Sequence, residues 1–144
     1  MGAETWEYCR MPGGYSPGET REDCTFDADK AARAVRFFPK YVKHTKGKNG
    51  PLELEPWQQK IIATLWGWRR PDGTRRYRLA YVEIPRKAGK STLASGVALM
   101  LLYMDGEAGA EIYSCAADLD QAGLVFEMAK GSVDIHRRFI FWQT

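Results

Sequence analysis

Residues that form metal sites and disulfides are scarce in this sequence. It has three cysteines and two histidines among 144 residues, and no two cysteines have the C-x-x-C spacing. A structural zinc site needs four suitably spaced ligands, so the composition argues against one. Scattered cysteines in an odd number are typical of free thiols in a reducing compartment. We therefore expect Cys9, Cys24 and Cys115 to be free thiols in a cytoplasmic protein.

Long apolar runs and secretion signals are also lacking. No stretch reaches the roughly 18 consecutive apolar residues of a transmembrane helix, so no membrane association is expected. The N-terminal residues MGAETWEYCR contain no basic segment followed by an apolar one, which argues against a secretory signal. Hydrophobic residues make up 44% and charged residues 27% of the chain, as in ordinary globular proteins. The length is that of one domain or part of one.

Charge of one sign does not dominate either. A formal net charge of +3 is too small to indicate a nucleic-acid partner by itself. Basic residues nevertheless form two clusters. The first consists of Lys40, Lys43, Lys46 and Lys48. The second consists of Arg69, Arg70, Arg75, Arg76 and Arg78. A solvated loop surface and a DNA-facing surface are both compatible with these clusters.

The first half of the chain contains signals for two helices. Residues 1–25 are rich in glycine and proline and are expected to form an extended arm. Asp27 is a suitable cap for a helix through AARAVRFF, whose apolar residues recur at helical spacing, and Pro39 is expected to kink or end it. A second helix is predicted from Pro56 to Gly67, followed by a turn at residues 71–73.

The central stretch, residues 77–104, predicts a strand, a tight basic loop and a buried helix. Residues 77–84 are rich in β-formers and end at a proline, and the helix that follows the loop is apolar on nearly every face. Between them, Gly89 permits close approach of the backbone to an anion, Lys90 is placed to reach phosphates, and the Ser91 hydroxyl is a candidate ligand of Mg²⁺. Only the A-G-K-S half of the usual P-loop is present, because Ile84 stands at the first glycine position.

A second strand and helix follow. AEIYSCA, residues 110–116, predicts a short buried strand, and Asp118 with Gln121 has the spacing of a capping box. The next helix places Ala122, Val125, Phe126 and Ala129 on one face. Strand, helix, strand and helix in this order predict an α/β fold with parallel strands and right-handed crossovers.

Several motifs in order resemble the N-terminal ATPase region of the large terminase subunit of tailed phages. They include PWQ, LWGWRRPDGTRRYR, YVEIPRKAGKST and DGEAGAEIYSCAAD, and the resemblance covers roughly residues 25–130. It implies a three-layer P-loop NTPase fold, of which residues 26–144 would be the N-terminal part, and binding of ATP with Mg²⁺. The phosphate-binding residues that it implies are Arg86, Lys87, Ala88, Gly89, Lys90, Ser91 and Thr92. It also implies that Gln58 reads adenine.

The sequence departs from that family in one respect. A motor ATPase needs a buried strand that ends in an aspartate for Mg²⁺ and a following glutamate that activates water. Asp105 and Glu107 are the superficial candidates, but they follow the P-loop helix directly and are better interpreted as a polar turn. We therefore expect the first portion of a longer product, whose predicted strands near Tyr81 and Ile112 expose apolar faces.

The leading hypothesis is the ATP-binding part of a DNA-packaging motor that moves double-stranded DNA into a procapsid in the host cytoplasm. The resemblance implies a portal protein, a small terminase subunit and a homo-oligomeric ring as partners. Two alternatives stay open: a nucleotide-binding fragment without catalysis, and a helicase-type P-loop ATPase. Whether the chain hydrolyses ATP also stays open, because no catalytic residue is assigned.

Overall fold

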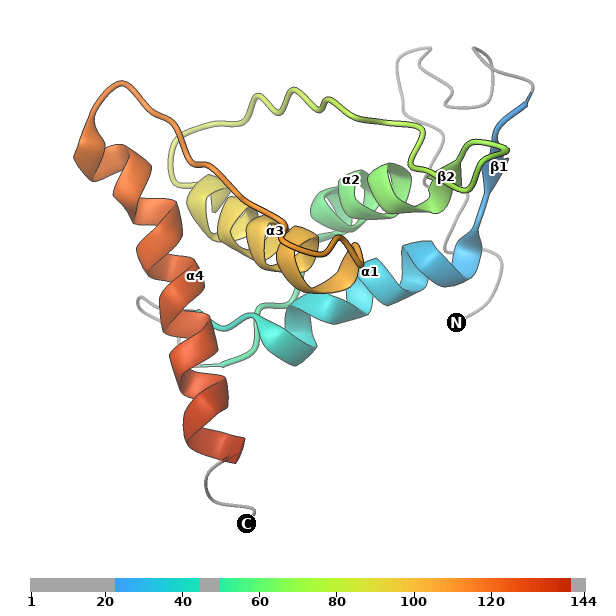
Figure 1. Ribbon diagram of the computed structural model, residues 1–144. Coiled ribbons are helices and arrows are strands. Elements are labelled where there is room, and N and C mark those ends of the chain that lie inside the picture. The colour runs from blue at the N-terminus through green and yellow to red at the C-terminus, as the bar shows by residue number, and fades with distance from the viewer. Residues whose placement is uncertain (1–22, 45–49, 141–144) are drawn as a thin grey trace. The chain divides into compact units, whose positions relative to one another are not determined.

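The computed structural model describes residues 23–44 and 50–140, with side chains as far as Val133 (Figure 1). The chain divides into two compact units, one formed by Met1–Arg36 with Leu54–Val82 and the other by Phe37–Glu53 with Glu83–Thr144. Most of the predicted arm, Lys46, Lys48 and Cys9 lie outside the described residues. None of the described helices has the length and apolar character needed to cross a membrane.

A two-stranded antiparallel sheet and helix α2 organise the first unit. Strand β1 (Thr25–Phe26) pairs with β2 (Trp68–Arg69) in the register Thr25↔Arg69 and Phe26↔Trp68. The Asp27 amide donates to the Gly67 carbonyl at 2.8 Å. The Phe26 ring lies where a side chain at Gly67 would be, because a Cβ there would come within 2.3 Å of Phe26 Cε2. Glycine at this position therefore allows the strand to approach the end of α2.

Helix α2 (Pro56–Gly67) begins and ends at the predicted residues. Proline suits the first helical position because its missing N–H would have no partner there. Ile62 and Trp66, two residues of the predicted apolar stripe, are buried. The predicted turn follows β2, where the Arg70 amide donates to the Thr74 carbonyl at 2.9 Å and Gly73 has φ +80°. The hydroxyl and the amide of Thr74 donate to Asp72 Oδ1 and lower the pKa of that carboxyl.

Helix α1 (Ala28–Tyr41) confirms the predicted Asp27 cap, since Asp27 Oδ1 accepts the Lys30 amide at 2.9 Å. The predicted apolar face is buried, with Ala31, Ala34, Val35 and Phe38 at most 9% exposed. Pro39 does not end the helix, which continues to Tyr41. The Val42 amide still donates to Phe38 O at 2.8 Å, so the chain keeps its helical bonding beyond the proline.

The Asp27 cap predicts a pH-dependent contribution to stability. The Lys30 amide bond lowers the pKa of Asp27 below its ordinary value of 3.8. Because the pKa of Asp27 is lower in the folded protein than in the unfolded chain, the cap stabilises the protein fully above about pH 4. This stabilisation is lost as the pH falls through the pKa of Asp27 in the folded protein. We expect Asp27→Ala to lower the free energy of unfolding at pH 7 by about 1 kcal/mol in urea titrations. Asp27→Asn keeps the cap oxygen, so it should retain stability at pH 7 and lose this pH dependence; an unchanged pH dependence in Asp27→Asn would contradict the assignment.

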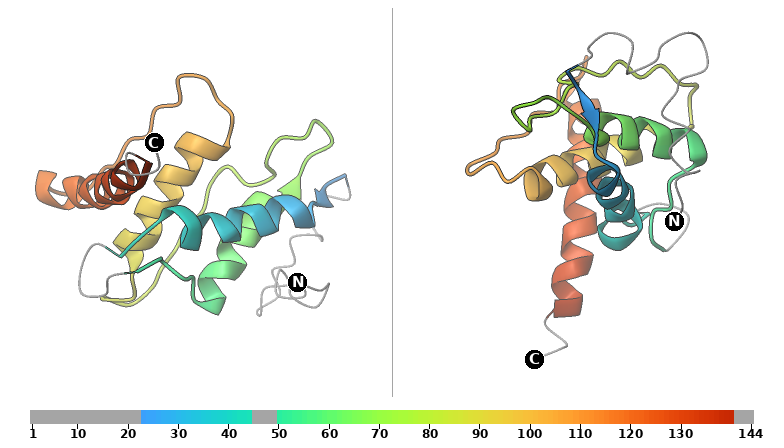
Figure 2. Two further views of the ribbon diagram at one scale, coloured as in Figure 1. Left: turned by 90° about the horizontal axis from the view of Figure 1, so that it is seen from below. Right: turned by 90° about the vertical axis from the view of Figure 1, so that its right-hand side faces the viewer.

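Helices α3 (Lys90–Met104) and α4 (Leu119–Ile140) cross and pack against each other in the second unit (Figure 2). The Thr92 hydroxyl lies 4.0 Å from Met128 Sδ across this contact. Gly96 on α3 lies against the Phe38 ring, which is fully buried. Asp118 caps α4 as predicted, accepting the Gln121 amide at 2.8 Å. The C-terminal segment, which the sequence pattern left undetermined, is helical as far as Ile140.

The predicted parallel sheet is not present in the described residues. Residues 77–84 and 110–116 form no strand, and the sheet that does form is the short antiparallel pair β1 and β2. A β-strand needs a neighbour that accepts and donates its backbone hydrogen bonds. Neither segment has such a neighbour among the described residues, and Leu79 and Tyr81 are 88% and 87% exposed. The architecture is therefore a mixed one of helices with a small two-stranded sheet.

The expectation that α3 is buried on every side is also wrong. Leu93, Leu99 and Met100 are buried, whereas Leu102 and Tyr103 are exposed. An apolar helix is buried all round only when neighbours cover every face. The described side chains of α3 therefore include an exposed apolar end at Leu102 and Tyr103.

Candidate nucleotide-binding site

The loop before α3 is a tight turn with two residues in the left-handed region of backbone conformation. It runs from Pro85 to Gly89, and the Ala88 amide donates to Pro85 O at 3.4 Å. Gly89 has φ +80°, which costs a residue without a Cβ little. Lys87 has φ +65°, a left-handed conformation that is unfavourable for a residue with a side chain. Backbone strain of this kind is often found at binding sites, where a close turn must be held in place.

The N-terminus of α3 is open toward this loop. Gly89 is the N-cap and provides no side-chain hydrogen bond to the helix. The first intrahelical bond runs from the Leu93 amide to Gly89 O at 2.9 Å, so the amides of residues 90–92 precede the helical ladder. Free amides at a helix start, together with the positive end of the helix dipole, attract phosphate oxygens. The geometry therefore suits an anion at the predicted place.

Lys90 bends back over the loop. Its Nζ donates to the Ile84 carbonyl oxygen at 2.9 Å, which spans the loop from the residue before Pro85 to the first residue of α3. The acceptor of this hydrogen bond is a backbone carbonyl, which every residue type has. The contact therefore could not be predicted from the pattern of side chains in the sequence. The ammonium is exposed, and an incoming phosphate group can therefore compete with Ile84 O for it.

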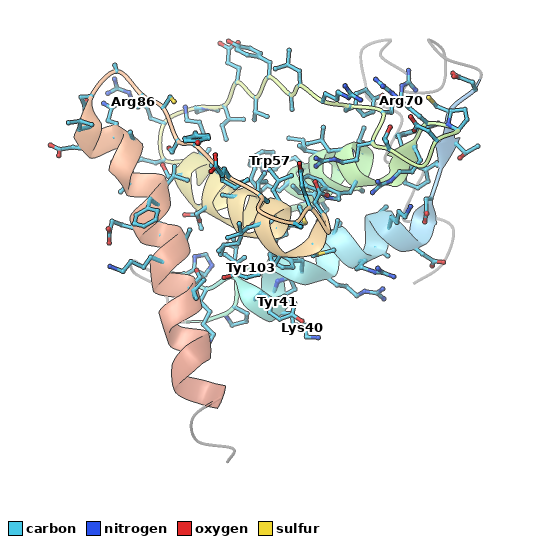
Figure 3. The ribbon with its side chains drawn as sticks, in the orientation of Figure 1. Lys40, Tyr41, Trp57, Arg70, Arg86 and Tyr103 are labelled. Carbon is cyan, nitrogen blue, oxygen red and sulfur yellow. The ribbon has the colours of Figure 1, made fainter. Side chains whose placement is uncertain are left out.

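The other residues predicted to bind phosphate differ in how exposed they are and in where their side chains lie. Arg86 and Lys87 are exposed on the loop, where Figure 3 labels Arg86. Ala88 and Ser91 are half-buried, on the turn and in the first turn of α3. The Thr92 hydroxyl is directed toward Met128 on α4, so Thr92 has its backbone amide to offer to a phosphate. The loop and the helix start thus bring these residues together in one unit.

The terminase large subunit ATPase domain family matches residues 56–143, which is more than half of the chain. The chain belongs to this family. The match confirms the resemblance seen in the sequence motifs, and it includes the loop, α3 and α4. ATP binding follows as a property of an ATPase domain. Comparisons with curated proteins and with solved structures gave no match.

Gln58, which the resemblance to terminases assigns to adenine, has a structural role in α2. Its Oε1 accepts the Glu55 amide at 2.9 Å, and the Glu55 side chain accepts the Gln58 amide, so the two residues form a capping box. Gln58 is 7% exposed, which leaves little of the amide accessible. The oxygen retains a second lone pair and the nitrogen its two donors. Adenine recognition by Gln58 therefore stays a prediction.

Asp105 and Glu107, in the turn after α3, are exposed as expected. Asp105 is the C-cap of the 15-residue helix that Lys90 begins. A rise of 1.5 Å per residue places the two ends of such a helix about 20 Å apart. These carboxylates therefore lie too far from Ser91 to share a metal ion with it. No group of three or more histidine, cysteine, aspartate or glutamate residues suited to a metal occurs in the described part of the chain.

The magnesium ion that an ATPase domain implies has one fitting protein ligand in the loop region. The Ser91 hydroxyl follows Lys90 in the first turn of α3, beside the open amides. A hard cation prefers oxygen ligands and takes most of them from water and from the phosphates of the nucleotide. A single hydroxyl beside the anion site therefore fits a Mg²⁺ ion that arrives together with ATP.

Proposed function

We propose that this terminase ATPase domain binds Mg·ATP at the loop of residues 85–92. The observation that supports this most strongly is the open N-terminus of α3, where Gly89 leaves the helix without a side-chain cap and Lys90 begins it. The amides of residues 90–92 would hold the β-phosphate, and Lys90 would leave Ile84 O to bind the β- and γ-phosphates. The Arg86 guanidinium would make forked contacts with phosphate oxygens from the exposed side of the loop.

Ser91 would hold the magnesium ion in this arrangement. When bound, such an ion would supply positive charge that offsets the negative charge of the phosphate oxygens and so favour transfer of the γ-phosphoryl group to water. The protein residues orient the nucleotide: the backbone amides fix the phosphate chain, and Lys90 and Arg86 compensate its negative charge. Gln58 is the proposed adenine contact, through the donors that its cap does not use.

In the complete motor, we propose that ATP hydrolysis at this site drives translocation of double-stranded DNA into a procapsid. Membership of the terminase family supports this function. The same membership supports the expected partners, namely a portal protein, a small terminase subunit and further copies in a ring. The proposed setting is the host cytoplasm, where packaging would take place.

A second function, nucleotide binding without turnover by this chain, is favoured by the position of its acidic residues. Asp105 and Glu107 lie at the opposite end of α3 from Lys90, about 20 Å away. Water activation needs a general base within hydrogen-bonding distance of the attacking water. Within the described residues, these two candidates do not meet that condition.

Binding and turnover should therefore be measured together on the purified 144-residue chain. We expect a fluorescent ATP analogue to bind in the presence of Mg²⁺ and to be displaced by ATP, with phosphate release no faster than in buffer. Binding is expected because the loop and the start of α3 are formed within one unit. Absence of binding would contradict the proposed site. Turnover above the buffer rate would contradict the second function and would require an acid from another chain or segment.

A further inference from the structure

The end of α2 and the hairpin that follows it, residues 68–78, bury hydrogen-bond donors that lack acceptors. The indole Nε1 atoms of Trp66 and Trp68 and the Nε atom of Arg70 are buried, and none of them has a hydrogen-bond partner among the described residues. Trp66 as a whole is 4% exposed. Burying a donor without an acceptor is costly, so native proteins pair nearly all such groups. These donors therefore indicate a partner that offers oxygen atoms.

The same hairpin carries an excess of positive charge, and Figure 3 labels one of its arginines, Arg70. Its one acidic residue is Asp72, whose carboxylate accepts hydrogen bonds from Thr74. Two guanidinium groups lie over aromatic rings, at 5.2 Å from the ring centre of Trp66 and 5.5 Å from that of Trp68. A stacked guanidinium directs its N–H groups outward in its own plane, where they suit carboxylate oxygens. The partner is therefore expected to carry negative charge. The five arginines of the hairpin are Arg69, Arg70, Arg75, Arg76 and Arg78.

The chain itself brings a segment with acidic residues to this hairpin. Strand β1 pairs with β2 in the register Thr25↔Arg69, so the residues before Thr25 enter the sheet beside the hairpin. Residues 1–22, called the N-terminal segment below, contain four glutamates and two arginines. At up to about 3.5 Å per residue, the Cα of Glu22 can be no further than about 11 Å from that of Thr25, and the Cα of Glu19 no further than about 21 Å. Both glutamates are therefore within reach of the hairpin, which belongs to the same compact unit.

We propose that the N-terminal segment docks on the hairpin and supplies the missing acceptors, with Glu19 and Glu22 as the anionic contacts of Arg70. Their carboxylates would accept from the guanidinium, and backbone carbonyls of the same glycine- and proline-rich segment would accept from the indole N–H groups. A DNA backbone also offers anionic oxygens, but it contacts a protein from the solvent side. Trp66 is too buried for its indole to be reached from there, which favours a segment that folds with the unit.

A zero-length cross-link in the full chain tests the contact. Arg70→Lys keeps the positive charge and introduces an amine. A carbodiimide activates a glutamate carboxylate, the amine attacks it to form an amide, and the carbodiimide takes up the elements of water and leaves as a urea. We expect a cross-linked monomer in which residue 70 is joined to Glu19 or Glu22, as identified by mass spectrometry of tryptic peptides. Changing both glutamates to glutamine should abolish this product, whereas Glu4→Gln with Glu7→Gln should retain it.

Thermal unfolding measures whether the contact stabilises the protein. Glu19→Gln with Glu22→Gln should lower the unfolding midpoint by about 3 °C at low ionic strength. The shift should shrink in about 1 M salt, because charges near the surface are screened. The matched control, Glu4→Gln with Glu7→Gln, changes the charge of the same segment equally and should leave the midpoint unchanged. In an Arg70→Gln background the Glu19 and Glu22 substitutions should have a smaller effect, since their partner is already absent.

Three results would overturn the proposal. The first is the absence of the cross-link from residue 70 to Glu19 or Glu22. The second is a cross-link that joins two copies, because the segment would then dock on another chain. The third is an equal effect of the two glutamate pairs on the unfolding midpoint. If the cross-link is absent and Arg70→Gln weakens binding of a duplex oligonucleotide, the hairpin contacts nucleic acid and not the N-terminal segment.

Discussion

Lys90→Ala is expected to weaken Mg·ATP binding by about 100-fold, since a charge-assisted contact with phosphate contributes up to about 3 kcal/mol. Lys90 is the first residue of α3, and its Nζ already reaches over the loop to Ile84 O at 2.9 Å. No other lysine of the loop shares that position. Isothermal titration with ATP in the presence of Mg²⁺ measures the effect directly.

The matched control for this experiment is Lys87→Ala, which removes the same charge from the same loop. Lys87 is exposed and has φ +65°, and alanine would keep a Cβ in that left-handed conformation. The backbone strain is therefore similar in the two proteins. We expect Lys87→Ala to change ATP affinity only a few-fold and to do so less at high salt, because an exposed charge is screened. Equal losses in the two variants would mean that net charge, and not the position of Lys90, controls binding.

Gly96→Ala is expected to destabilise the second unit although alanine is the better helix former. A Cβ at Gly96 would lie 2.4 Å from Phe38 Cε1 and 2.9 Å from Cδ1, and the Phe38 ring is fully buried. Overpacking of this kind costs about 1–3 kcal/mol, whereas the gain in helix propensity is about 1 kcal/mol. The steric cost should exceed the gain and lower the free energy of unfolding by up to about 2 kcal/mol, as measured by urea denaturation.

Gly123→Ala in α4 is the comparison that isolates the steric effect. Nothing lies within 4 Å of a Cβ at this position, and its backbone conformation is an ordinary helical one. The same substitution should therefore raise stability by about 0.5–1 kcal/mol. The two variants are expected to shift the unfolding midpoint in opposite directions. A stabilising Gly96→Ala would mean that Phe38 does not pack against α3 as described.

Local signals in the sequence predicted the helices and their ends well. Asp27 caps α1, Pro56 begins α2, and Asp118 caps α4. These features depend on groups within a few residues of each other, so the residue types are sufficient to indicate them. The tight loop before α3 also belongs to this class, because Gly89 and Lys90 are adjacent in sequence and in space.

The strands could not be predicted in the same way. Residues 77–84 and 110–116 have strong β-forming composition, yet both remain extended and exposed. A strand is stable only with a partner, and a partner is a property of the whole fold. The strands that do form, Thr25–Phe26 and Trp68–Arg69, are far apart in sequence and too short to give a periodic pattern.

The residues of the candidate site also divide into features that the sequence predicted and contacts that only the tertiary structure revealed. The types and spacing of Gly89, Lys90 and Ser91 indicated phosphate chemistry because that chemistry needs a backbone approach, a cation and a hydroxyl at consecutive positions. The tertiary structure alone revealed that Gln58 Oε1 caps α2 and that Lys90 bonds to the Ile84 carbonyl. Both contacts involve backbone groups, which every residue type shares. Residue identity therefore carries the chemistry of this protein, whereas three-dimensional contacts determine which of its polar groups remain available for a ligand.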